Sequence, residues 1–212
     1  MEIAEVAARA PVIPVLTIER VADALPLARA LVRGGLPVLE ITLRTPAALE
    51  ALKAIASDVP EAIVGAGTVL NEAQLDRAQA AGARFGVSPG CAMALLAAVR
   101  KARMPFLPAV QTVSEALGLA DQGFTVLKFF PAGSAGGPGW LKAVAAPLPE
   151  IRFCPTGGIS QENAPTYLAL PNVACVGGSW VAPPAAVAAG RWGDIERLAA
   201  AAAALKRVPL RA

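Results

Sequence analysis

The sequence predicts an α/β fold in which one compact domain, residues 1–212, forms a (β/α)8 barrel. Short β-branched runs alternate with alanine-rich helical stretches along the whole chain, and each strand–helix unit takes about 26 residues. Such repeats form a parallel sheet, and eight of them are the number that closes a barrel of the TIM type. An open, doubly wound sheet of similar length is the alternative.

The elements follow in order from these patterns. Strands are expected at residues 12–16, 37–43, 62–65, 84–87, 106–109, 125–129, 151–154 and 173–176. Helices are expected at residues 18–33, 46–57, 72–81, 92–103, 114–122, 138–145, 163–169 and 193–207. Thr45 before Pro46, and Asn71 before Glu72, are typical helix starts.

The composition predicts a soluble, cytoplasmic protein. Hydrophobic residues make up 55% of the chain and the mean hydropathy is +0.53, an excess that comes largely from alanine. The uncharged segment 166–190 is interrupted by three prolines and a Gly-Gly pair, so it cannot form an apolar helix of about 20 residues. Glu2 and Glu5 lie where a signal peptide has basic residues, so no signal peptide is expected.

Charge and residue usage exclude several classes of function. The net charge of +3 is spread along the chain without a basic cluster, which argues against nucleic-acid binding. The three cysteines, Cys91, Cys154 and Cys175, are widely spaced, as expected of reduced thiols. Histidine is absent, which removes Ser-His-Asp and Cys-His catalysis and histidine-based zinc sites. Acid–base chemistry must therefore fall to carboxylates, lysine, tyrosine, thiols or water.

Lys128 is the most informative single residue. It lies in the run Phe124-Thr-Val-Leu-Lys-Phe-Phe-Pro-Ala132, an ammonium group in a predicted buried strand. Burying an unpaired charge is costly, and a neutral, desolvated amine is the nucleophile that forms a Schiff base with a ketone. The apolar neighbours Leu127, Phe129 and Phe130 favour the neutral amine, whereas an ionised Glu40 nearby would favour the charged form. The structural alternative is a strand lysine that reaches solvent or pairs with an acid.

Polar residues recur at the carboxyl ends of the strands, where barrels of this kind carry their active sites. In the second strand, alternation places Glu40, Thr42 and Arg44 on one face. Glu40 and Lys128 are the most deeply placed charges and are expected to meet inside the barrel. A pair that only holds the barrel together would be a poor stabiliser, because desolvation offsets the attraction of two buried ions. Catalysis is therefore the favoured interpretation, and the Arg44 fork suits a carboxylate.

Two glycine-rich turns follow the last two strands. They are Pro155-Thr-Gly-Gly-Ile-Ser160 and Gly177-Gly-Ser-Trp180. Glycine lets backbone amides approach an anion, and barrels often hold phosphate in these loops. One Gly-Gly pair alone is usually only a turn, but two pairs at these positions predict a phosphate site.

Six motifs, in this order along nearly the whole chain, carry a resemblance to one known family. They are Glu40-Ile-Thr-Leu-Arg44, Gly65-Ala-Gly-Thr68, Val87-Ser-Pro-Gly90, Leu127-Lys-Phe-Phe-Pro-Ala132, Pro155-Thr-Gly-Gly-Ile159 and Val176-Gly-Gly-Ser-Trp180. The chain resembles the class I pyruvate aldolases that act on 2-keto-3-deoxy-6-phosphogluconate (KDPG) or 4-hydroxy-2-oxoglutarate (KHG). The resemblance implies that Lys128 forms the Schiff base and that Glu40 transfers protons.

The resemblance also implies how the substrate is bound. The residues around the carboxylate and the reacting carbons are Arg44, Thr68, Pro89, Phe130 and Thr156. The residues around the phosphate are Gly157, Gly158, Gly178 and Ser179. It implies a 2-keto acid and a phosphorylated aldehyde as reaction partners, a metal-independent lyase without a cofactor, and a homotrimer.

Two positions depart from the family pattern. Ala109 stands where relatives commonly have a glycine after the proline, and Gly133 stands where many have a glutamate. Both are expected near the pocket rather than at the reactive amine, and therefore bear on substrate preference. Three alternatives stay open, namely an aldolase for the galactonate epimer, a phosphate-handling isomerase or synthase, and a phosphosugar-binding barrel without catalysis.

Overall fold

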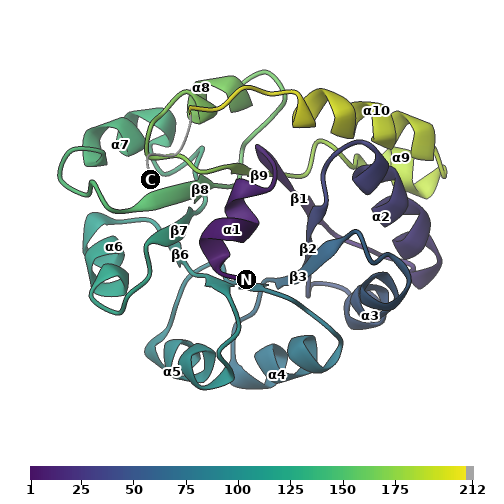
Figure 1. Ribbon diagram of the computed structural model, residues 1–212, viewed down its shortest axis with the longest axis horizontal. Helices are drawn as coiled ribbons and strands as arrows, with labels where there is room; N and C mark the ends of the chain where they lie inside the picture. Colours follow the sequence, from purple (N-terminus) through teal and green to yellow (C-terminus); the bar gives the residue numbers. More distant parts are fainter. Residues whose placement is uncertain (209–212) are drawn as a thin grey trace.

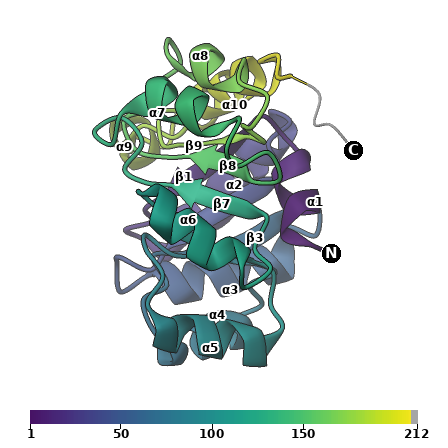
Figure 2. The ribbon, with the colours of Figure 1, turned by 90° about the vertical axis from the view of Figure 1, so that its left-hand side faces the viewer.

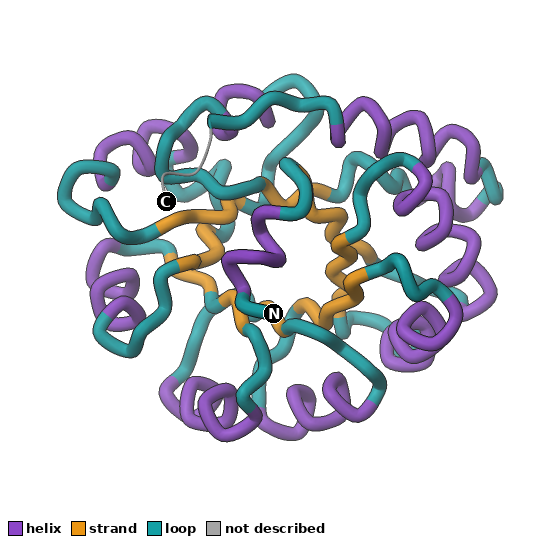
Figure 3. The backbone as a smooth tube through the Cα atoms, viewed as in Figure 1, coloured by secondary structure: helices purple, strands orange, loops and turns teal. Residues whose placement is uncertain are grey.

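The computed structural model describes residues 1–208 and has an α/β fold with parallel strands. The strands curl around the centre of the molecule and the helices lie outside them (Figures 1 and 3). The exception is α1 (Ile3–Ala8), which lies across the middle in this view. Among residues 1–208, no helix combines the length and the apolar character that a membrane span requires.

Within residues 1–208, nine strands form two sheets. They are β1 (Val12–Leu16), β2 (Val38–Thr42), β3 (Ile63–Gly67), β4 (Gly86–Val87), β5 (Phe106–Leu107), β6 (Ala109–Val110), β7 (Val126–Phe129), β8 (Arg152–Pro155) and β9 (Val176–Gly178). One sheet has the order β5-β4-β3-β2-β1-β9 and the other has the order β6-β7-β8. Two isolated parallel bridges, Phe153–Val173 and Thr156–Gly177, connect β8 with the segment that contains β9.

Ten α-helices and one 3-10 helix connect the strands within the described chain. After α1 they are η1 (Val21–Asp23), α2 (Ala24–Arg33), α3 (Ala48–Asp58), α4 (Glu72–Ala80), α5 (Met93–Ala102), α6 (Val113–Ala120), α7 (Gly137–Val144), α8 (Ala164–Leu168), α9 (Pro184–Ala188) and α10 (Trp192–Ala203). The short helices α1 and α9 were not expected from the sequence. Each spans little more than one turn, too short for a helical pattern to stand out.

The predicted strands are recovered with shifted ends, and one is divided. The first strand has both predicted ends. The predicted strand 106–109 is split at Pro108, so that β5 pairs with β4 and β6 pairs with β7. Proline has no N–H to donate to a ladder. The Pro108 carbonyl is still used, because it accepts a hydrogen bond from the Lys128 amide at 2.9 Å.

One of the two predicted helix starts is confirmed. The Asn71 side chain accepts a hydrogen bond from the Gln74 amide at 3.0 Å and caps α4. The start at Pro46 was wrong, because α3 begins at Ala48. The Thr45 hydroxyl donates instead to the Ile18 carbonyl at 2.6 Å, which ties this loop to the loop after β1.

Side-chain alternation divides the core into two clusters. Leu127 and Phe129 belong to the outer cluster between strands and helices, where Phe129 stacks on Trp140 of α7 with ring centroids 4.4 Å apart. Val126 belongs to the inner cluster. Because side chains alternate along a strand, Lys128 faces inward with Val126.

Helix α1 covers the amino ends of the strands. Its Val6 and Ala7 join the inner cluster together with Val38 and Ile63, the first residues of β2 and β3. Figure 2 shows α1 at one end of the strands. The Arg207 guanidinium donates to the carbonyls of Ala7, Ala8 and Ala174, which holds the helix in place. Residue 207 therefore lies beyond α10, which ends at Ala203 rather than continuing to 207 as expected.

Helix α6 begins with a capping box whose energy depends on pH. The Glu115 carboxylate accepts hydrogen bonds from the amides of Gln111 and Thr112 at 2.7 and 2.8 Å, and the Thr112 hydroxyl accepts from the Glu115 amide. The Gln111 amide makes the largest contribution to lowering the pKa of Glu115 below its ordinary value of 4.5. A lowered folded-state pKa stabilises the fold above the ordinary value, and the gain is lost as the pH falls through the folded value.

We therefore expect Glu115→Ala to lower the free energy of unfolding at pH 7 by about 1 kcal/mol, because a helix cap is lost. In denaturant titrations the difference from wild type should shrink as the pH falls below 4.5. Glu50→Ala is the control, because Glu50 lies in the first turn of α3 without a cap hydrogen bond. A deficit for Glu115→Ala that does not change with pH would contradict this assignment.

Candidate active site

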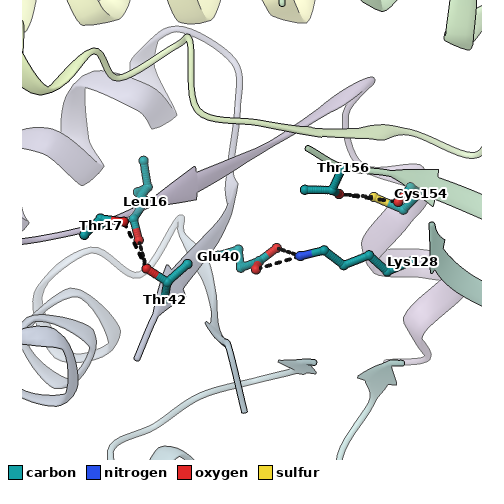
Figure 4. A network of polar contacts seen from close by, with 7 residues as sticks. All are labelled: Leu16, Thr17, Glu40, Thr42, Lys128, Cys154 and Thr156. Carbon is teal, nitrogen blue, oxygen red and sulfur yellow. Dashed lines mark hydrogen bonds and ion pairs between the residues drawn. The ribbon is translucent and has the colours of Figure 1, made fainter. Parts of the chain in front are cut away.

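Lys128 and Glu40 form a buried ion pair between β7 and β2. The Lys128 Nζ donates to Glu40 Oε1 at 3.1 Å and to Oε2 at 3.4 Å (Figure 4). The two side chains are 6% and 4% exposed. In every other ion pair of residues 1–208 at least one partner is more than half exposed. The prediction that the side chains of Lys128 and Glu40 contact each other on the inner side of the strands is confirmed.

The apolar shield around Lys128 differs from the one expected. Leu127 and Phe129 face away from the amine into the outer core, because neighbouring strand residues point to opposite faces. Phe130 approaches it, with 5.5 Å between Nζ and the ring centroid. Cys154 on β8 is the register partner of Lys128 and is 2% exposed.

Ala109 also lies closer to Lys128 than expected. It is the register partner of Lys128 in the ladder between β6 and β7. The expectation that this departure from the family pattern lies away from the reactive amine was therefore wrong. The divided fifth strand places its second half directly beside β7.

Glycine at position 67 makes room for the Glu40 carboxylate. Gly67 pairs with Thr42 in the ladder between β2 and β3, and a β-carbon at Gly67 would collide with the Glu40 side chain. The Thr42 hydroxyl donates to the Leu16 carbonyl at 2.9 Å, so this side chain is used to join β2 to β1 (Figure 4).

A cavity of about 730 Å³ opens beside the ion pair at the carboxyl ends of β1, β8 and β9. The site residues predicted from the sequence that line it are Arg44, Phe130, Thr156, Gly157, Gly158, Gly178 and Ser179. The other four predicted residues, Lys128, Glu40, Thr68 and Pro89, are outside this lining. Phe130 connects the two groups, because it lines the cavity and contacts the amine of Lys128.

The glycine turn after β8 lines this cavity. Gly157 and Gly158 have φ angles of +94° and +74°, a conformation that suits glycine. Their carbonyls accept hydrogen bonds from the Gly133 amide and the Asn163 side chain. Within residues 1–208, neither glycine amide donates a hydrogen bond to the protein. The turn therefore has the unpaired donors that an anion site needs.

Gly133, the second departure from the family pattern, supports this turn. A β-carbon at Gly133 would lie 3.3 Å from the Gly157 carbonyl oxygen. A larger residue at this position would press against the turn, so the departure bears on the position of the turn.

Thr68 has a strained backbone at the end of β3. Its φ of +59° lies in the left-handed region, which is unfavourable for a β-branched residue. The other non-glycine residue with positive φ among residues 1–208 is Arg103, at the C-cap of α5. Strain of this kind persists where the surrounding structure imposes it, often at functional sites.

The loop after β1 contributes cavity residues that were not predicted from the sequence. Glu19, Arg20 and Asp23 line the cavity. Their position in the sequence could have identified them. They directly follow the carboxyl end of the first strand, where barrels of this kind carry functional residues.

The two buried thiols, Cys154 and Cys175, are small core residues. Both belong to the inner cluster and are free thiols. Interaction with Cys154, together with burial, raises the pKa of Cys175 well above its ordinary value. Among residues 1–208, no group of three or more Cys, Asp or Glu side chains is arranged to hold a metal ion.

Comparison with known proteins identifies relatives that cover nearly the whole chain. A family model described as KDPG and KHG aldolase matches residues 3–198. A 2-dehydro-3-deoxy-phosphogluconate aldolase of Pseudoalteromonas atlantica is 52% identical over 94% of this chain and 93% of the relative. A KHG/KDPG aldolase of Escherichia coli is 50% identical over 89% of each.

A solved structure gives the same result. The KDPG aldolase of Legionella pneumophila, with pyruvate captured at low pH as a covalent carbinolamine intermediate, has a TM-score of 0.94 and 46% identity. The match covers 96% of this chain and 99% of that one.

The strain at Thr68 gives a test that separates stability from activity. We expect Thr68→Gly to raise the free energy of unfolding by about 0.5–1 kcal/mol, because relief of strain exceeds the added entropy of the unfolded chain. Arg103→Gly relieves the same kind of strain away from the cavity and should stabilise similarly. Only the Thr68 variant should lose enzymatic activity, and equal activity of both variants would contradict a role for Thr68.

Proposed function

The chain belongs to the family of KDPG and KHG aldolases, and we propose that it is a class I aldolase that cleaves KDPG to pyruvate and glyceraldehyde 3-phosphate. The observation that carries the proposal is the buried Lys128–Glu40 pair beside the cavity. It joins an amine and a carboxylate, the two groups that Schiff-base cleavage of a 2-keto-4-hydroxy acid requires.

The ion pair supplies the first step. A proton passes from Lys128 Nζ to Glu40 along the 3.1 Å hydrogen bond and leaves a neutral amine. The nitrogen lone pair attacks the substrate C2 carbonyl and forms a carbinolamine. Loss of the C2 hydroxyl as water, with a proton returned by Glu40, gives the protonated imine.

The second step breaks the bond between C3 and C4. Glu40, again ionised, removes the proton of the C4 hydroxyl. The C3–C4 electron pair moves into the imine and forms an enamine, while C4 leaves as the aldehyde. Protonation of the enamine at C3 followed by hydrolysis releases pyruvate and restores the amine. The buried setting of the pair excludes bulk water from the enamine.

Arg44 and Thr68 bind the carboxylate next to the reacting ketone in this proposal. Arg44 is exposed in the cavity lining and presents a charged fork suited to a carboxylate. Pro89 and Phe130 pack around the reacting carbons, and Thr156 flanks the chain of the substrate. Thr156 is held near the site by its bridge to Gly177.

The glycine turns favour a phosphorylated aldehyde. Gly157, Gly158, Gly178 and Ser179 line one side of the cavity, and the free amides of Gly157 and Gly158 suit a phosphate. KHG, which would release glyoxylate, is the second substrate, since its reacting carbons are the same. The galactonate epimer differs only in stereochemistry, and rates with both epimers distinguish them. A phosphosugar-binding protein without catalysis has no need of the buried pair.

The proposal also includes closure of the barrel, the single domain and the oligomeric state. We infer that the two sheets close into one (β/α)8 barrel that forms a single domain. The bridges between β8 and the β9 segment, and the continuity of β5 and β6 across Pro108, support closure. We also infer a homotrimer, for which the exposed apolar side chains of Leu70, Met93 and Leu117 are available as contacts.

Trapping of the imine tests the proposal directly. Borohydride added with pyruvate should inactivate the protein and add one reduced three-carbon unit at Lys128, detected by peptide mass spectrometry. Borohydride or pyruvate alone should leave activity unchanged. Lys142, on the surface helix α7, is the internal control and should stay unmodified. An adduct at another lysine, or none, would reject Schiff-base catalysis by Lys128.

A further inference from the structure

Arg20 and Asp23 form an unusual ion pair in the cavity lining. Arg20 Nε and Nη2 donate to the two Asp23 carboxylate oxygens, each at 2.8 Å. The Asp23 side chain is 10% exposed, whereas the acid of each other surface ion pair in residues 1–208 is at least 39% exposed. Asp23 lies in η1 and its backbone amide also donates to the Arg20 carbonyl.

The pair holds the guanidinium in place without covering it. The Arg20 side chain is 63% exposed and lines the cavity. A guanidinium has five N–H groups, so the two bonds to Asp23 leave three donors free. An arginine is cationic at neutral pH in any case, and hydrogen bonding to Asp23 raises the pKa of Arg20 further. An anchored arginine loses less entropy on binding an anion than a free one.

Among the described residues, the glycine turns and Ser179 on the proposed phosphate side of the cavity carry no positive charge. Its glycine turns contribute backbone amides, and Ser179 contributes a hydroxyl. A phosphate monoester carries nearly two negative charges at neutral pH. The cavity lining contains two basic residues, Arg44 and Arg20, and the first is assigned to the substrate carboxylate.

We propose that Arg20, positioned by Asp23, determines specificity by supplying the counter-charge for the phosphate of the aldehyde half of the substrate. Asp23 is a positioning residue, because its carboxylate is used by Arg20. This inference rests on the proposed function, since it concerns the far end of the same substrate. It adds the loop after β1 to a phosphate site otherwise built from the loops after β8 and β9.

The test compares KDPG with 2-keto-3-deoxygluconate, which has a hydroxyl in place of the phosphate. Arg20→Ala should lower kcat/KM for KDPG about tenfold to a hundredfold, mainly through KM, because charge-assisted hydrogen bonds are lost. The value for the unphosphorylated substrate should change less than about threefold. Arg20→Lys should recover part of the loss, because it keeps the charge without the fork.

A second variant controls for a loss of stability in Arg20→Ala. Arg20→Ala leaves the Asp23 carboxylate nearly buried and unpaired, whereas Arg20→Gln/Asp23→Asn removes both charges with little change of shape. The double variant should lose the preference for KDPG in the same way. Arg33→Ala, which breaks the exposed pair with Glu196, is the matched control and should behave as wild type.

Three results would overturn the inference. They are an unchanged preference for KDPG in Arg20→Ala and in the double variant, an equal loss with both substrates, and an unchanged affinity of Arg20→Ala for glyceraldehyde 3-phosphate in calorimetry. The calorimetric measurement needs no turnover, so it tests Arg20 even if Lys128 forms no adduct. A normal pyruvate adduct in Arg20→Ala would show that the Schiff-base step does not depend on Arg20. The preference of this variant for KDPG over 2-keto-3-deoxygluconate then tests the role of Arg20 separately.

Discussion

The buried contact between Lys128 and Glu40 is the interaction around which the structure is arranged. Two ions that are 6% and 4% exposed lose most of their hydration, and their attraction does not reliably repay that loss. Neither residue can be replaced alone without leaving the other as an uncompensated charge. A fold selected for stability alone would place apolar residues at both positions. We propose that the pair is kept for chemistry, since proton exchange between its members would generate the nucleophile of the proposed mechanism.

The two ends of the strands and the two hydrophobic clusters have different functions in the fold. The inner cluster and α1 close the amino ends of the strands, and the cavity opens at the carboxyl ends of β1, β8 and β9. The outer cluster, with Phe129 stacked on Trp140, fixes the strands against the helices. At the carboxyl ends of the strands, Thr68 is strained and, within residues 1–208, the amides of Gly157 and Gly158 donate no hydrogen bond to the protein. The packing contacts that stabilise the fold therefore lie away from the site of the proposed reaction.

Much of this was predictable because alternation and repeat length are local signals. The strand–helix order, the inward orientation of Glu40 and Lys128, and the two glycine turns follow from spacing alone. Other features depend on long-range geometry. The division of the fifth strand at Pro108, the position of Ala109 opposite Lys128, and the orientation of Leu127 away from the amine required the register between strands. The Arg20–Asp23 pair was missed because three-residue spacing on a loop is common among exposed ion pairs, and only burial of Asp23 sets it apart.

The most direct measurement replaces the ion pair with apolar residues and follows stability and catalysis together. If the pair exists for chemistry, Lys128→Met/Glu40→Leu should unfold at the same free energy as wild type or up to about 4 kcal/mol higher, and should have no aldolase activity. Each single replacement should be less stable by about 3–5 kcal/mol, since one buried charge is left alone. A double variant that is several kcal/mol less stable than wild type, or that still cleaves KDPG, would contradict the account.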